Sequence, residues 1–225
     1  MIQGPQMIRI KICCIQSKAE ARLAVQHGAN AVGLVSEMPS GPGVISDAEI
    51  GDIAREVPPG VDAVLLTSLR SASDVIQQQR RTFVGAIQLC DELPLGDYAE
   101  LRKNLPGIKL IQVVHVDGSG AVEEALAVAE YIDAILLDSG SKKGEQKELG
   151  GTGKTHDWSI SAEIRKAVPV PIFLAGGLNS RNVGEAIAVV KPYGVDVCNG
   201  VRSHGDLDEA KLQAFMESVR GCTGA

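Results

Sequence analysis

The stretch IRIKIC at residues 8–13 is a short run of branched apolar residues that ends in a reactive one, Cys13. Seven similar runs follow along the chain, and each is followed by an amphipathic stretch of the kind that forms a helix. The expected strands cover residues 8–13, 31–36, 62–68, 84–90, 109–116, 134–139, 171–175 and 194–198. The expected helices cover residues 17–27, 46–56, 71–81, 97–104, 119–130, 160–167, 179–190 and 207–219.

This alternation decides the fold class. Eight strand–helix pairs in 225 residues give about 28 residues per unit, the period of a (β/α)8 (TIM) barrel. An open doubly wound sheet has the same alternation. However, no stretch resembles a linker between domains, and the runs are apolar on both faces, including the first and the last. We therefore predict an α/β protein in which residues 1–225 form a single (β/α)8 barrel domain.

Local signals mark the ends of several expected helices. Ser46 and Glu49 have the spacing of a capping box, Ser161 is a capping-type residue close to an acid, and Asn179 precedes another helical stretch. Gly28 follows the first helix at the position where a left-handed residue is expected. We predict helix starts at the first three positions and a helix end at Gly28.

Composition and charge limit the classes of function. The net charge is -6 without a basic run, which argues against a nucleic-acid partner. No stretch reaches the roughly 18 apolar residues that span a bilayer. The five cysteines include no Cys-x-x-Cys motif, and the four histidines have no metal-ligand spacing. The sequence predicts a cytoplasmic protein with no membrane partner and no bound metal, and leaves its oligomeric state open.

Cys13 and Asp138 each close an apolar run. In α/β proteins the carboxyl ends of the strands carry the chemistry, and the strand bodies form the core. A thiol and a carboxyl group brought to one face by different strands suit proton transfer. Alternatively, Cys13 is a small buried hydrophobe and Asp138 caps a helix or forms a surface salt bridge. We predict that both residues are catalytic.

Two loops after the last two expected strands have the composition of an anion site. Gly176 and Gly177 lie between a strand and a helix, and Asn199 and Gly200 follow the final strand. Backbone N–H groups at such positions bind anions, and in barrels the loops after strands seven and eight often form one phosphate site. Simple turns are the alternative. We predict that these four residues bind phosphate.

The longest irregular stretch, residues 139–158, begins directly after Asp138 and is rich in glycine and lysine. Long loops in compact domains are often functional, and these residues suit a lid over the substrate. Its segment GGTGKT at 150–155 is similar to a nucleotide-binding P-loop, but Glu148 stands where the first glycine is required. We therefore exclude a P-loop.

Taken in order, the motifs of this chain resemble those of the phosphoribosylanthranilate isomerase family. No single motif is decisive, but the ordered set covers nearly the whole chain. The matching segments are KICCI (11–15), AVGLV (31–35), IQL (87–89), LLD (136–138), GGTG (150–153), DW (157–158), AGGLN (175–179) and GVDV (194–197).

The resemblance implies an isomerase of tryptophan biosynthesis that converts phosphoribosylanthranilate to a 1-deoxyribulose phosphate by Amadori rearrangement. Asp138 would be the acid that opens the sugar ring, and Cys13 the base that takes the proton from sugar C2. Lys11, Gln88 and Gly151 would bind the substrate, a small phosphorylated sugar. This chemistry needs an acid, a base and the Schiff base of the substrate, so no cofactor is implied.

Some residues depart from the family pattern. Cys14 replaces a glycine after the catalytic cysteine, Cys90 and Asp91 replace a His-Gly pair, and Arg202 replaces a glutamate. The loop at 40–46 lacks the arginine that helps to hold the anthranilate carboxylate in the family. Three functions therefore stay open: this isomerase, an isomerase or lyase for another phosphorylated sugar, and a barrel that only binds such a metabolite.

Two basic residues have alternative interpretations. Lys11 is two residues from Cys13 on the same side of its strand and would favour a thiolate, or it is an interior charge paired with an acid such as Asp196. Arg70, in the loop after the third strand, would replace the missing arginine, or it is a solvated surface residue. We favour the surface interpretation for Arg70.

Overall fold

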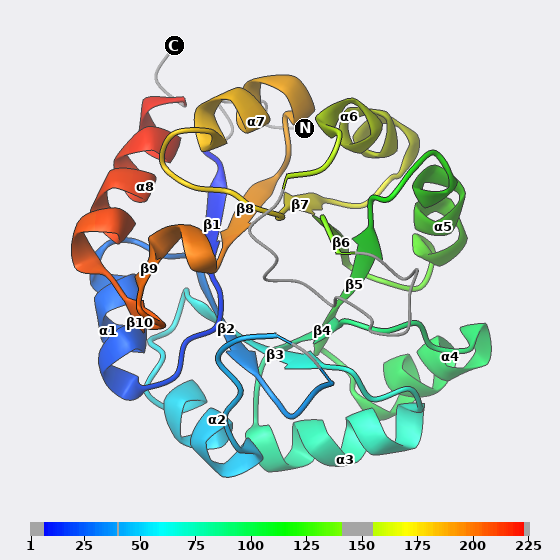
Figure 1. Cartoon of the computed structure of the whole chain (residues 1–225). Coiled ribbons are helices and arrows are strands. Elements are labelled where there is room, and N and C mark those ends of the chain that lie inside the picture. Colours follow the sequence, from blue (N-terminus) through cyan, green and yellow to red (C-terminus); the bar gives the residue numbers. More distant parts are fainter. Residues whose placement is uncertain (1–6, 40, 141–154, 223–225) are drawn as a thin grey trace.

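All eight apolar runs form strands, and the strands are parallel. The computed structural model describes residues 7–39, 41–140 and 155–222, and within them the sheet closes into a barrel (Figure 1). Each strand pairs with its neighbours in the chain, and the first pairs with the eighth. The strands are β1 (Arg9–Ile12), β2 (Ala31–Val35), β3 (Asp62–Thr67), β4 (Ala86–Leu89), β5 (Lys109–His115), β6 (Ala134–Asp138), β7 (Ile172–Leu174) and β8 (Gly194–Val197).

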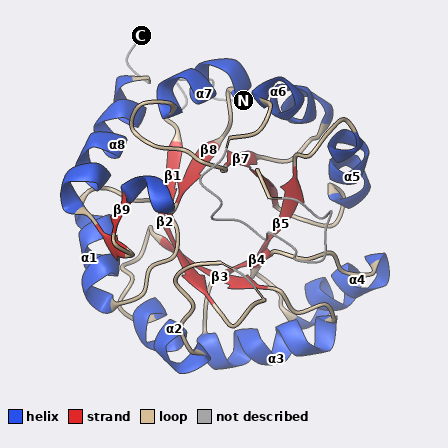
Figure 2. Cartoon of the chain, viewed as in Figure 1, coloured by secondary structure: helices blue, strands red, loops and turns tan. Residues whose placement is uncertain are grey.

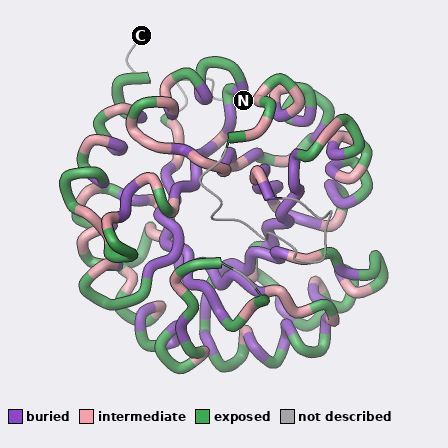
Figure 3. Tube along the Cα trace, viewed as in Figure 1, coloured by how far each residue is buried: buried purple, intermediate pink, exposed green. Residues whose placement is uncertain are grey.

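The helices form a ring outside the barrel (Figure 2). They are α1 (Lys18–Gln26), α2 (Asp47–Ala54), α3 (Ala72–Thr82), α4 (Leu95–Asn104), α5 (Gly120–Val128), α6 (Trp158–Ala167), α7 (Val183–Val190) and α8 (Glu209–Gly221). Burial follows this arrangement, because the strands and the inward helix faces are buried while the outward helix faces are exposed (Figure 3). The predicted (β/α)8 barrel is confirmed.

The core has two parts. The larger cluster of apolar side chains lies between the sheet and the helices and includes Ile12, Leu34 and Phe215. A smaller cluster contains Val64, Leu66 and Cys13 and fills the inside of the barrel. Side chains that alternate along each strand supply the two clusters in turn. These inner side chains pack together in the middle of the barrel, and cavities lie at the two ends of the strands.

Two of the predicted helix ends are confirmed. The Ser46 side chain accepts a hydrogen bond from the Glu49 N–H while Glu49 bonds back to Ser46, which completes the capping box of α2. Gly28 follows α1 with a φ of 95°, the left-handed conformation that glycine adopts without strain.

Two predicted helix starts are wrong. Helix α6 begins at Trp158 because Asp157 caps it, and its side chain accepts from the Ser159 N–H at 2.9 Å. Ser161 therefore lies inside the helix. Helix α7 begins at Val183, since Asn179 forms a turn in which its N–H donates to Asn182 Oδ1 at 2.8 Å. At α6 a nearby residue caps the helix in place of the expected one, whereas at α7 the N-cap position is taken by Asn182, whose side chain makes no capping hydrogen bond.

The chain between β8 and α8 forms small elements that periodicity does not predict. A single 3-10 turn, η1 (Asn199–Val201), leads into a short antiparallel hairpin of β9 (Arg202–Ser203) and β10 (Asp206–Leu207). This hairpin carries Arg202 back towards the end of β1. Among the described residues, no helix has the length and apolar character to cross a membrane.

Candidate active site

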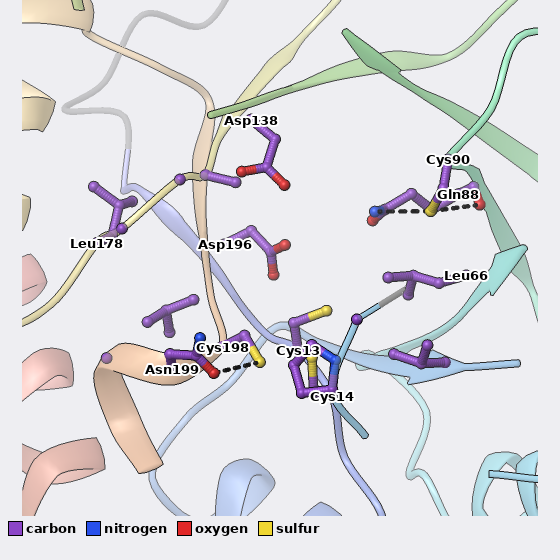
Figure 4. Close-up of a pocket in the computed structure, with 18 of the residues that line it drawn as sticks. Cys13, Cys14, Leu66, Gln88, Cys90, Asp138, Leu178, Asp196, Cys198 and Asn199 are labelled. Atoms are coloured by element: carbon purple, nitrogen blue, oxygen red, sulfur yellow. Dashed lines mark hydrogen bonds between the residues drawn. The ribbon is translucent and has the colours of Figure 1, made fainter. Parts of the chain in front are cut away.

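A cavity of about 260 Å³ opens at the carboxyl ends of the strands (Figure 4). Most of the predicted site residues line it: Cys13, Gln88, Asp138, Gly176, Gly177, Asn199 and Gly200. Lys11 is not part of its wall and lies buried in β1. Gly151 is outside the described residues, as is most of the GGTGKT segment. The cavity thus joins the predicted acid, base and phosphate loops at one end of the barrel.

The end of β1 places Cys13 beside an ion pair. Lys11 Nζ lies 3.0 Å from Asp196 Oδ1 in β8 and 3.5 Å from Cys13 Sγ. The two interpretations of Lys11 are therefore compatible, because its ammonium group contacts both the Asp196 carboxylate and the Cys13 thiol. A Cβ at position 33 would come within 2.8 Å of Cys13 Sγ and 3.0 Å of Lys11 Nζ, so Gly33 leaves the space that these groups occupy.

The surroundings of Cys13 favour its thiolate. The Cys14 thiol donates a hydrogen bond to it and lowers the Cys13 pKa; burial and Asp196 oppose this effect, and Lys11 adds to it. The charge of Lys11 is secure: burial alone would lower the pKa of its ammonium group, but Asp196 raises it above the ordinary value. The charged ammonium group of Lys11 therefore lies next to Cys13 Sγ, where it favours the thiolate.

Asp138 is the last residue of β6, and its surroundings favour the protonated form of its carboxyl group. Burial raises the pKa of its carboxyl group to about 6, and the nearby charge of Asp196 acts in the same direction. The Ser139 N–H donates to Oδ1 at 2.7 Å and opposes the rise. Asp138 and Asp196 both point into the cavity that Cys13 faces (Figure 4). A carboxyl group of this kind retains its proton at a higher pH than an ordinary aspartate.

The two phosphate-type loops pack directly on each other. Gly176 and Gly177 have φ values of 83° and 63°, which favour glycine. A Cβ at Gly200 would lie 2.0 Å from the Leu178 carbonyl oxygen, so only glycine allows this approach. Because α7 begins at Val183, its N-terminal turn does not follow the two glycines directly. An anion held in this region would therefore depend on the backbone N–H groups of the two loops and of η1.

The opposite side of the cavity is formed by β3 and β4. Gln88 Nε2 lies 3.7 Å from Cys90 Sγ, and burial raises the pKa of the Cys90 thiol to about 12. Cys90 is therefore neutral. Arg70 is largely exposed, and its Nε lies 3.9 Å from Asp91 Oδ1, outside the cavity wall. The structure therefore agrees with the interpretation of Arg70 as a surface residue.

Arg202 has a position that the sequence did not predict. Its guanidinium group is buried and donates to the Cys14 carbonyl, to the Cys13 carbonyl at 3.4 Å and to the Glu20 carboxylate at 2.9 Å. Cys14 has a φ of 62°, a conformation that is uncommon for residues other than glycine. Arg202 thus ties the loop after β1 to α1 and holds Cys14 in this conformation.

Replacement of Arg202 by methionine is expected to reduce the free energy of unfolding by about 3–5 kcal/mol, because it leaves the Glu20 carboxylate without its buried cation. Denaturant unfolding measures this loss. The matched control is Arg22→Met, which removes an exposed cation from Glu56 and should change the unfolding midpoint little. Equal effects of the two substitutions would contradict the anchoring role of Arg202.

No group of three or more His, Cys, Asp or Glu side chains in the described ranges 7–39, 41–140 and 155–222 is arranged to hold a metal ion. The cavity brings together a thiol whose pKa is lowered, a carboxyl group whose pKa is raised and glycine-containing loops.

Comparisons with known proteins agree with this geometry. The profile of the N-(5'phosphoribosyl)anthranilate (PRA) isomerase family matches residues 10–218. The N-(5'-phosphoribosyl)anthranilate isomerase 2 of Methanosarcina mazei is 38% identical over 215 residues, which cover 95% of this chain and 94% of the relative. The corresponding isomerase of Methanocella arvoryzae is 35% identical over 95% of this chain and 99% of its own.

Solved structures give the same result. The phosphoribosylanthranilate isomerase of Thermotoga maritima is similar with a TM-score of 0.82 and 33% identity, over 96% of this chain and 100% of that one. A phosphoribosylanthranilate isomerase in complex with reduced 1-(o-carboxyphenylamino)-1-deoxyribulose 5-phosphate has a TM-score of 0.80 and 30% identity, over the same shares of the two chains.

Proposed function

Because this chain belongs to the N-(5'-phosphoribosyl)anthranilate isomerase family and is an isomerase of tryptophan biosynthesis, we propose that Cys13 and Asp138 are its catalytic base and acid. The observation that supports this assignment best is their opposite tuning within one cavity. The pKa of the thiol is lowered, and the pKa of the carboxyl group is raised to about 6. Each shift thus increases the fraction of the group that is in the protonation state its step requires.

The proposed reaction begins at Asp138. Its proton passes to the furanose ring oxygen, the bond from that oxygen to C1 breaks, and C1 forms a Schiff base with the anthranilate nitrogen. The Cys13 thiolate then takes the proton from C2, and the electron pair of the C–H bond moves towards C1 and the nitrogen. Loss of the C2 hydroxyl proton and protonation of C1 give the ketose. Lys11 stabilises the thiolate electrostatically before the proton is taken.

Binding of the substrate is divided between the two sides of the cavity. We assign the phosphate to Gly176, Gly177, Asn199 and Gly200, whose loops lie together beyond β7 and β8. Gln88 faces the cavity from β4, and its Oε1 is buried without a hydrogen-bond partner among the described residues. This oxygen is an acceptor for a substrate hydroxyl or N–H group. Gly151 is assigned to the substrate on the family resemblance alone.

The substrate of this chain is a small phosphorylated sugar derivative, as is the analogue bound in the related solved structure. We place the protein in the cytoplasm, where thiols such as its five cysteines stay reduced.

Alkylation of Cys13 by iodoacetamide tests the assignment of the base. The rate should rise with pH through a midpoint below that of an ordinary thiol, about 8.5, because only the thiolate reacts. Modification of Cys13, measured by peptide mass spectrometry, should abolish turnover in proportion, and bound product should slow it. Full turnover by protein alkylated at Cys13 would exclude Cys13 as the base.

Gly200→Ala tests the phosphate loops. The added Cβ would lie 2.0 Å from the Leu178 carbonyl oxygen, so the two loops must separate. We expect KM to rise by about 10- to 100-fold, the loss of one or two charge-assisted hydrogen bonds, with a smaller change in kcat. Gly96→Ala is the control, since a Cβ at Gly96 meets no atom within 4 Å. An unchanged KM in the Gly200 variant would contradict the phosphate assignment.

A further inference from the structure

Two buried glutamines lie on neighbouring strands of the barrel and differ in their hydrogen bonds. Gln112 in β5 is satisfied, because its Oε1 accepts from the Tyr98 hydroxyl at 2.7 Å and its Nε2 donates to backbone carbonyl groups. Gln88 in β4 differs: its Oε1 is buried and accepts no hydrogen bond within the part of the chain that the structure describes. A buried acceptor of this kind reduces stability unless a ligand supplies the donor.

The side-chain amide of Gln88 belongs to the catalytic cavity. Gln88 is part of the cavity wall. Figure 4 shows its amide group directed into the cavity from β4, on the side opposite Asn199 and Leu178. The unpartnered oxygen is therefore placed where a substrate can reach it.

Cys90 determines which end of this amide faces the cavity. The Cys90 thiol donates to the Gln88 backbone carbonyl at 3.8 Å, and its sulfur accepts from Gln88 Nε2 at 3.7 Å. Burial raises the pKa of this thiol to about 12, so it keeps the single proton that it donates. Because that proton is directed at the carbonyl group, the sulfur offers the amide only a lone pair and selects its NH2 end. Oε1 is the end that remains for a ligand.

The two sides of the cavity indicate which donor the substrate brings. The phosphate is assigned to the loops beyond β7 and β8, and in the substrate it lies at the end of the sugar that is remote from the amine. The other side, where Gln88 lies, also carries the apolar side chains of Val35, Met38 and Leu66, which suit an aromatic ring. The group that joins such a ring to the sugar is the anilino N–H.

We propose that Gln88 is a further catalytic residue, whose Oε1 accepts a hydrogen bond from the anilino N–H and stabilises the positive charge that this nitrogen gains as the sugar ring opens. Cys90 is its positioning residue. This inference rests on the proposed function, because it uses the phosphate assignment and the ring-opening step.

The charge on nitrogen appears in the first step of the reaction. The proton of Asp138 passes to the ring oxygen, the C1–O bond breaks with its electron pair on that oxygen, and the nitrogen lone pair forms the C1=N bond. The nitrogen keeps its hydrogen and becomes positive, so its N–H is a stronger donor than in the substrate. When Cys13 takes the C2 proton, the C–H pair forms the C1=C2 bond and the C1=N pair returns to nitrogen. A contact that is strongest between these two events raises kcat.

Gln88→Met replaces the amide by an apolar side chain of similar length. We expect kcat to fall by about 10- to 100-fold, the value of a hydrogen bond to a charged group, with little change in KM. The thermal unfolding midpoint should stay level or rise, because the variant no longer buries an unpartnered oxygen. Gln112→Met is the matched control outside the cavity wall: it should lower the unfolding midpoint, since it breaks the bond from Tyr98, and leave kcat within a few-fold.

The binding of two inhibitors gives a readout that a purely structural role would not change. One is reduced 1-(o-carboxyphenylamino)-1-deoxyribulose 5-phosphate, and the other has an ether oxygen in place of its N–H. Calorimetry should show that wild type prefers the first by about 10- to 100-fold, since the ether leaves Oε1 unpaired. The preference should disappear in Gln88→Met, weaken in Cys90→Ala, and persist in Cys90→Ser, whose hydroxyl group donates and accepts as the thiol does.

Equal affinities of wild type for the two inhibitors, or an unchanged preference in Gln88→Met, would overturn the proposal. An unchanged preference in Cys90→Ala would overturn the positioning role of Cys90. Inhibitor binding involves no proton transfer, so this test separates failure of the inference from failure of Cys13 or Asp138 in their assigned roles. The KM of Gly200→Ala checks the phosphate assignment independently.

Discussion

Turnover of phosphoribosylanthranilate by Cys13→Ser is expected to fall by about 100- to 10,000-fold, the contribution of a positioned general base. A hydroxyl group has almost no anionic form at neutral pH, and neither Lys11 at 3.5 Å nor the Cys14 hydrogen bond compensates for this difference. Steady-state kinetics with freshly prepared substrate measures kcat, and we expect KM to change little because the phosphate loops are untouched.

Serine is only slightly smaller than cysteine, so the variant should retain the fold. A thermal unfolding curve close to that of wild type will show this. The exposed Cys222→Ser variant should have wild-type kinetics. A Cys13→Ser variant that works within a few-fold of wild type would remove Cys13 from the mechanism and leave the thiol as a packing residue.

Asp138→Asn is the second substitution with a large expected effect. The amide keeps the shape of the side chain but has no acidic proton, so ring opening loses its general acid and kcat should fall by about 100- to 10,000-fold. Asp91→Asn is the matched control, because Asp91 is an acid two residues beyond the end of β4 and lies outside the cavity wall. Near-normal turnover by Asp138→Asn would assign ring opening to another group.

The pH dependence distinguishes the acid from the base. Wild type needs Cys13 ionised and Asp138 protonated, so its profile should fall at both low and high pH, with apparent pKa values that belong to the pair. In Asp138→Asn only the ionisation of Cys13 remains. The residual turnover should therefore rise with pH and then stay level, and a persisting fall at high pH would contradict the assignment of Asp138.

The sequence predicted the barrel well because its signal is repeated eight times. Each strand is an apolar run whose length and β-branched content are visible locally, and the strand ends place Cys13 and Asp138 without any knowledge of contacts. The rule that chemistry lies at carboxyl ends then brought the two residues together. The same rule applies to Cys198, which follows β8, but its thiol was not considered.

The features that the sequence did not reveal depend on long-range contacts. Arg202 meets the carbonyl groups of Cys13 and Cys14 across more than 180 positions of chain, and no local pattern indicates such a contact. The positive φ of Cys14 was not predicted either, although the glycine that Cys14 replaces in the family pattern is the residue type that suits this conformation. The starts of α6 and α7 were misplaced because several capping residues lie close together and only the backbone path selects one.

The burial of Asp138 has a consequence for the stability of the whole barrel. Its carboxyl group ionises at an ordinary value of 3.8 in the unfolded chain and at about 6 in the folded one. Between these values the folded protein binds more protons than the unfolded chain, so the free energy of unfolding decreases as the pH rises from about 4 to about 6 and stays lower above that range.

At 1.36 kcal/mol for each pKa unit, the loss at neutral pH is on the order of 3 kcal/mol. Ionised Asp138 thus destabilises the protein at the pH where it works, and the remaining core of the barrel must compensate. Selection for the most stable chain would remove this carboxyl group, so its presence agrees with the proposed role of Asp138 in proton transfer.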